Sequence, residues 1–248
     1  MSLENPQKDK SDWGDLPSED FIEGKVPFEF SYVFPDGKVM EVLQDKDGIG
    51  NVVIRDRDQI IFNATSLLPS QYKLVTPTYF LKFPEERDFT GSWTTDHDRK
   101  IINLGEFKSP QDLLSILHEI GHSANDKAEE LKKMDEIDKK LNFISTEKQK
   151  RGGKESGYDA WLEKEDARLR SRIERRAWAW ALNQLRELKQ KRGLPTEVLF
   201  PTFEHLKKYV DDNLASYRRA YEWIVEEGYD PGFYKELKEL FDKGQYVG

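Results

Sequence analysis

The stretch SPQDLLSILHEIGH, residues 109–122, governs how the rest of the chain is interpreted. Ser109 is suited to an N-cap, Pro110 to the first helical position, and Asp112 to the first turn, where an acid interacts well with free backbone N–H groups. Leucine and isoleucine then recur at helical spacing. The sequence therefore predicts an amphipathic helix over residues 110–124.

Two histidines lie four residues apart on this predicted helix, as His118 and His122. That spacing places both imidazoles on one face, where they can reach one metal ion. Zinc accepts imidazole nitrogen at about 2.0–2.1 Å. Glu119 follows the first histidine, where a carboxylate can take a proton from a water at the metal. Gly121 leaves room for a close neighbour. We expect Zn²⁺ bound by His118 and His122, with Glu119 as the catalytic base.

Catalytic zinc usually has three protein ligands, so a third is needed. No histidine follows His122 at the spacing of the extended metzincin pattern, because position 128 is Ala128. Glu174 heads an apolar helical stripe made of Trp178, Ala181, Leu185 and Leu188. An unpaired charge on such a face is costly, and a metal ion would account for it. Glu174 is the expected third ligand.

Alternatives to this ligand set remain open. Glu174 can instead form a salt bridge with Arg172 or Arg176, and three other carboxylates are then available as ligands: Glu163, Glu165 and Asp166. The remaining histidines are His97, in a polar turn, and His205, on a predicted helix. Both are interpreted as structural.

Upstream of the histidine helix the pattern changes to period two. Phe28, Phe30, Tyr32 and Phe34 alternate ahead of a Pro-Asp-Gly turn at 35–37, which is typical of a β-hairpin. Further strands are predicted at 52–54, 59–63, 79–83 and 100–104. Downstream, helices are predicted at 126–149, 158–192, 202–227 and 231–243. This gives an α+β fold: a flexible segment at 1–25, a β-rich half at 26–108 and a helical half at 109–248.

The composition limits the function. The net charge is −8, and basic clusters are interleaved with acids, so nucleic acid is an unlikely partner. The absence of cysteine excludes disulfides, thiolate ligands and cysteine nucleophiles. The sequence shows neither an apolar leader nor a run of about 18 apolar residues, so we expect no membrane association and a cytoplasmic protein.

These residues make the chain resemble the gluzincin metallopeptidases, which carry HExxH on one helix and a glutamate ligand on a later one. It is most similar to the ImmA/IrrE-like group, where the first motif often reads HE[IL]GH. The later helix in that group carries a Glu-x-x-Ala-x-x-aromatic-Ala pattern, matched here by Glu174, Ala177, Trp180 and Ala181. The resemblance implies a zincin-like metallopeptidase domain over 26–248, with an edge strand beside the metal cleft.

The likeness covers roughly residues 80–185, and the chain departs from the group in two ways. The segment between His122 and Glu174 is longer than the group predicts, and no helix-turn-helix module is evident. The function expected is a zinc-dependent endopeptidase acting on a protein or peptide substrate. Candidates for stabilising the oxyanion are His205, Tyr217 and Tyr221. The alternatives are a metal-dependent hydrolase of a non-peptide substrate, and a zincin-shaped binding or regulatory protein without catalysis.

Overall fold

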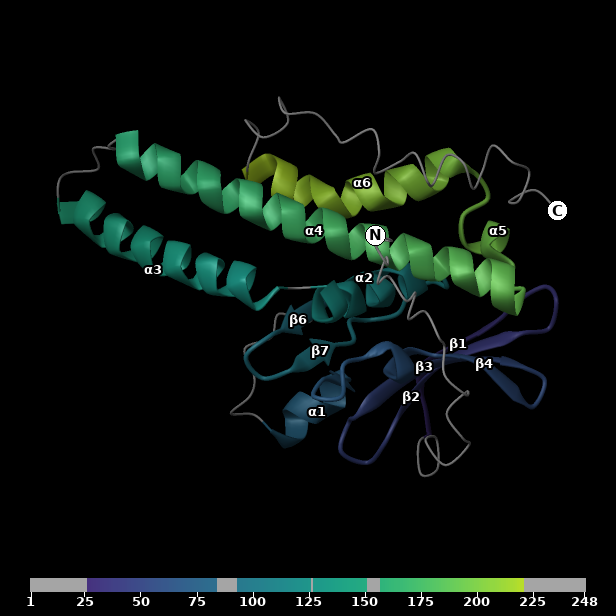
Figure 1. Cartoon of the computed structure of the whole chain (residues 1–248). Helices are drawn as coiled ribbons and strands as arrows, with labels where there is room; N and C mark the ends of the chain where they lie inside the picture. Colours follow the sequence, from purple (N-terminus) through teal and green to yellow (C-terminus); the bar gives the residue numbers. More distant parts are fainter. Residues whose placement is uncertain (1–25, 84–92, 126, 151–156, 221–248) are drawn as a thin grey trace, which may run out of the picture.

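A computed structural model describes residues 26–83, 93–125, 127–150 and 157–220. Strands occupy the N-terminal half and helices the C-terminal half (Figure 1), which confirms the predicted α+β class. Within these ranges, no helix has the length and apolar character needed to cross a membrane. The predicted flexible segment 1–25 and the predicted helix 231–243 lie outside the described residues.

The first sheet is an antiparallel meander of four strands in the order β1-β2-β3-β4. The strands are β1 (Val26–Val33), β2 (Val39–Gln44), β3 (Gly50–Asp56) and β4 (Gln59–Asn63). The predicted hairpin between β1 and β2 is confirmed: the Phe34 N–H donates to the Lys38 carbonyl at 2.8 Å, and Gly37 takes φ +87° in the turn. Phe34 is buried while Val33 is exposed, as period-two alternation requires.

A second sheet of three short strands lies next to the histidine helix. Its order is β5 (Lys73–Val75), β7 (Ile101–Asn103) and β6 (Thr94–Asp96). The central strand β7 runs parallel to β5 and antiparallel to β6. Strand β6 is therefore an edge of this sheet as described, and it packs against the helix that carries both histidines.

The strand predicted at 79–83 is wrong. Residues Pro77–Lys82 form the helix α1, with Pro77 at its first turn. Pro77 fixes a φ suited to a helix start. The side chains of Tyr79 and Phe80 are both buried. Tyr79 also meets Phe83, four residues on, with ring centroids 4.7 Å apart. The aromatic run follows helical spacing.

Helix α2 (Asp112–Asn125) lies at the centre of the molecule, between the β layer and the long helix α4 (Gly157–Arg192) (Figure 1). Every residue from Leu113 to His122 is buried. At the start the Asp112 carboxylate accepts from the backbone N–H of Lys108 and Ser109, which is the part of the predicted cap that the acid supplies, while Pro110 lies before the first helical residue. The predicted helix is thus confirmed, with its first residue at Asp112.

Two of the remaining helices were predicted: α3 (Ala128–Lys150) and α6 (Phe203–Ala220). The short helix α5 (Thr196–Leu199) was not predicted. Helix α6 is joined to α2 by Tyr209, whose hydroxyl lies 2.7 Å from Ser115 Oγ and 3.3 Å from an Asp112 oxygen. The stripe expected on α4 is buried throughout, at Trp178, Ala181, Leu185 and Leu188.

Helix α3 and residues 157–173 of α4 form an antiparallel pair, here called the helical arm, which extends beyond the sheets (Figure 1). Its small core is separate from the main one and contains Ile137, Leu162, Leu169 and Ile173. A buried carboxylate, Asp166, binds Arg170 through two oxygens at 2.8 and 2.9 Å, and Arg170 also reaches Asp138 at 2.5 Å.

We predict that Asp112→Ala lowers the free energy of unfolding by about 1–2 kcal/mol, because it removes the acceptor for two N–H groups at the start of α2. Denaturant unfolding monitored by circular dichroism measures this. Glu106→Ala is the matched control: the Glu106 side chain is 72% exposed, and we expect a change within about 0.5 kcal/mol. Equal stability of Asp112→Ala and wild type would contradict the assigned cap.

Candidate metal centre

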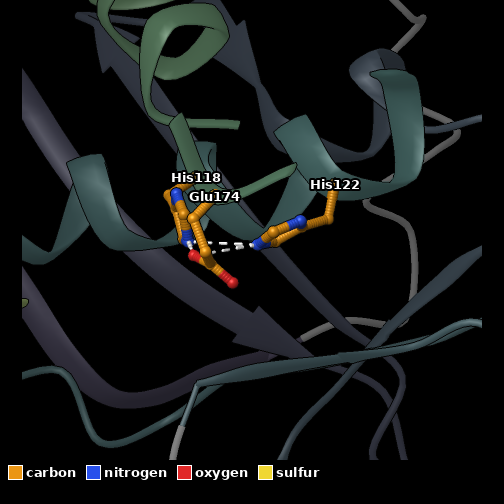
Figure 2. A group of neighbouring side chains, drawn as sticks. All are labelled: His118, His122 and Glu174. Carbon is orange, nitrogen blue, oxygen red and sulfur yellow. Dashed lines mark hydrogen bonds and ion pairs between the residues drawn. The ribbon is translucent and has the colours of Figure 1, made fainter. Parts of the chain in front are cut away.

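Three buried side chains from two helices converge on one point (Figure 2): His118 and His122 from α2, and Glu174 from α4. The two imidazoles approach each other through Nε2, at 3.2 Å. Glu174 Oε2 lies 3.2 Å from Nε2 of His118 and 3.5 Å from Nε2 of His122. The structure therefore brings together the three residues expected as ligands, in a group that could hold a metal ion.

The triangle formed by these three atoms fits a tetrahedral ion. Bonds of about 2.0–2.2 Å at tetrahedral angles place neighbouring donor atoms about 3.3–3.6 Å apart. The observed separations of 3.2, 3.2 and 3.5 Å lie close to that range. Two imidazole nitrogens and one carboxylate oxygen are also a donor set that zinc accepts.

The polar atoms of the cluster are poorly satisfied by the protein. Glu174 Oε2 is buried and has no hydrogen-bond partner of good geometry among the described residues. Burial opposes ionisation of Glu174, but the imidazoles of His118 and His122 outweigh it and hold its pKa well below the usual value. When both imidazoles are neutral and turn Nε2 lone pairs toward this carboxylate, a metal ion between them satisfies all three groups.

A close contact between α2 and α4 sets the position of Glu174. A Cβ added to Gly121 would lie 2.7 Å from the Ala177 carbonyl oxygen and 3.1 Å from the Ala177 Cα. Only glycine allows the backbones to approach this closely. Ala177 follows Glu174 by about one helical turn, so the contact brings the carboxylate against the histidines of α2. The room expected beside Gly121 is thus filled by α4.

The ring of His118 is held by stacking. The indole of Trp178, one turn after Glu174 on α4, lies with its centroid 4.2 Å from the imidazole, at an interplanar angle of 26°. His118 Nδ1 is buried and has no hydrogen-bond partner among the described residues. A metal-binding histidine is usually oriented by a hydrogen bond from its second nitrogen. Here the aromatic face of Trp178 limits rotation of the ring.

Glu119 lies beside this cluster, with Oε1 3.9 Å from His118 Nε2. Its other oxygen, Oε2, accepts a hydrogen bond at 2.8 Å from the hydroxyl of Thr95 on β6. The expected base is therefore next to the ligand atoms and is tied to the edge strand.

The alternative ligands have other partners. Glu163 is exposed, Glu165 pairs with Lys133 and Arg168, and Asp166 is bound by Arg170. The alternative salt bridge of Glu174 is not formed either, because Arg176 binds Glu130, and Arg172 lies 4.0 Å from the same carboxylate. Attraction to Arg176 and the other nearby cations outweighs partial burial and lowers the pKa of Glu130.

The other histidines do not join the cluster. His97 Nδ1 lies 2.9 Å from the Tyr72 hydroxyl, and His205 is exposed near the start of α6. The side chain of Tyr217 and the whole of Tyr221 lie outside the described residues, so these candidates for the oxyanion stay predictions.

Two residues of the site were not assigned to it from the sequence. Trp178 was recognised as part of a buried stripe, but nothing in the sequence places it on His118. Thr95 belongs to a segment interpreted as a polar turn, whereas Thr94–Asp96 is the strand β6. The adjacent β-branched residues Thr94 and Thr95 were the available signal for a strand.

Comparison of the chain with family models, curated proteins and solved structures found no match.

We predict about one zinc ion per chain in protein purified without chelator, and loss of zinc affinity by at least about 100-fold in Glu174→Ala. Removing an outer-shell partner already costs about 10–100-fold, and a ligand contributes more. Elemental analysis and competition with a chromophoric chelator measure both quantities. The control Glu163→Ala removes an exposed carboxylate of the same helix and should change affinity less than about twofold. Equal affinities in the two variants would exclude Glu174 as a ligand.

Gly121→Ala should destabilise the protein by about 1–3 kcal/mol, because the new methyl group collides with the backbone of α4. Helix propensity alone predicts the opposite sign, a gain of up to about 1 kcal/mol. Thermal unfolding of the metal-free protein decides between the two effects. A stabilised Gly121→Ala protein would contradict the close contact described above.

Proposed function

We propose that this chain is a zinc-dependent peptidase of the gluzincin type, similar to the ImmA/IrrE-like metallopeptidases, with a zincin-like fold. The observation that carries the proposal is the convergence of His118, His122 and Glu174 in a buried triangle of tetrahedral size. An adjacent carboxylate, Glu119, supplies a base at the same point. A purely structural zinc site is usually closed by four protein ligands. This group has three among the described residues, which favours an open, catalytic site.

Zinc, when bound, would make a water molecule acidic near neutral pH and polarise the carbonyl of the bond to be cleaved. His118, His122 and Glu174 would hold the ion, and because two neutral imidazoles and one carboxylate cancel only one of its two positive charges, the site would stay cationic. Glu119 accepts the proton of the attacking water and then delivers it to the leaving amine. Each of these four residues is 7–8% exposed, so the surrounding protein excludes most water without sealing the site.

The position of β6 supports a peptide as the substrate. Among the described residues it is an edge of the second sheet, it contacts α2, and it carries Thr95 beside Glu119. An extended peptide can add to a strand edge through main-chain hydrogen bonds, whatever its side chains. Such a peptide would lie along β6 with its backbone near the base. A strand edge beside the base favours a peptidase over a hydrolase of small molecules.

We predict that Glu119→Gln binds zinc with an affinity within a few-fold of wild type but cleaves peptides at least about 100-fold more slowly. The amide keeps the shape of the side chain and cannot accept the proton. Mass spectrometry of a peptide mixture incubated with the zinc-loaded protein measures new termini against time.

The matched control is Glu163→Gln, which makes the same change at an exposed position and should cleave like wild type. Cleavage by Glu119→Gln at the wild-type rate would exclude Glu119 as the base. Full zinc binding by wild type without any peptide cleavage would favour the non-peptide hydrolase or the non-catalytic protein.

A further inference from the structure

The carboxylate of Glu119 is held asymmetrically, with a different environment for each oxygen. Oε2 accepts from the Thr95 hydroxyl at 2.8 Å. Oε1 lies 3.9 Å from His118 Nε2, too far for a hydrogen bond, and has no such partner among the residues that the structure describes. One oxygen is thus anchored on β6, and the other is left near the atoms that would bind the metal.

We propose that Thr95 is a positioning residue for Glu119: its hydroxyl fixes Oε2 so that Oε1 stays beside the metal without coordinating it. This inference rests on the proposed function. A glutamate side chain has three rotatable bonds, and an unanchored carboxylate this close to a cation could swing inward and become a fourth ligand. A base must instead be held within hydrogen-bond reach of the water that it deprotonates.

Thr95 has a second acceptor within reach, which defines the alternative role. Its Oγ1 also lies 3.0 Å from the backbone carbonyl oxygen of Glu119. One hydroxyl proton cannot serve both acceptors fully. The carboxylate oxygen is nearer, and a hydrogen bond to a charged acceptor is stronger than one to a carbonyl. If the carbonyl were the real acceptor, Thr95 would only tie β6 to α2, and its removal would act independently of the Glu119 side chain.

The neighbouring residue provides a control within the same strand. Thr94 Oγ1 is buried and has no hydrogen-bond partner among the described residues. Side chains alternate along a strand, so Thr94 points to the opposite face from Thr95. Thr94→Val and Thr95→Val therefore make the same chemical change on opposite faces of β6, and only Thr95→Val removes a contact with Glu119.

The test uses acetohydroxamic acid, a small zinc chelator whose acidic proton a neighbouring carboxylate can accept, titrated calorimetrically into the zinc-loaded full chain. Zinc affinity is measured for every variant. We expect Thr95→Val to retain zinc affinity within about twofold and to bind the probe about five- to tenfold more weakly, the effect of one hydrogen bond. Thr95→Ser and Thr94→Val should bind the probe within about twofold of wild type.

A double-mutant cycle separates the two roles of Thr95. Adding Thr95→Val to Glu119→Gln should lower the affinity for the probe by less than about a further twofold, because the carboxylate that Thr95 positions is already absent. If Thr95→Val lowered probe affinity by the same factor in wild type and in Glu119→Gln, the proposal would be overturned. Unchanged probe binding by Thr95→Val, loss of zinc from that variant, or failure of zinc-loaded wild type to bind the probe would also overturn it. Wild type that binds no zinc would overturn the proposed function itself, which distinguishes the two failures.

Discussion

The site depends on one steric constraint, the backbone contact between α2 at Gly121 and α4 at Ala177. A methyl group at position 121 would lie 2.7 Å from a carbonyl oxygen, so any other residue would push the helices apart. Both histidines lie on α2, within one turn of this contact, and Glu174 lies one turn before it on α4. The glycine and the triangle of His118, His122 and Glu174 are therefore parts of one arrangement: the candidate metal centre lies where the two helices meet.

The helical arm shows how a long segment between His122 and Glu174 can leave this arrangement intact. Helix α3 leaves the end of α2, and the first part of α4 runs back alongside it, so the chain returns near its starting point. The arm has its own apolar cluster, and the ion pair of Arg176 with Glu130 ties its base together. Glu174 consequently reaches the histidines despite the many residues that separate them in the sequence.

The features that the sequence predicted are those with local causes. The cap at Ser109–Asp112, the histidine spacing, the Pro-Asp-Gly turn and the stripe on α4 each follow from neighbours a few residues apart. The strand wrongly predicted at 79–83 also had a local signal against it, Pro77 at the start of α1, whereas the features that were missed have non-local causes. The strands β5 and β6 were not predicted, and each is formed by pairing with β7 rather than by a pattern of its own. The contact of Thr95 with Glu119 likewise arises only when β6 packs on α2.

The most direct test of the account is anomalous diffraction at the zinc absorption edge from crystals of the full chain grown with zinc. We expect one strong peak per chain, in contact with Nε2 of His118, Nε2 of His122 and a carboxylate oxygen of Glu174. The Glu119 carboxylate should lie beside the ion without binding it. The absence of a peak among these residues, or a peak with Glu174 turned away to an arginine, would contradict the central claim.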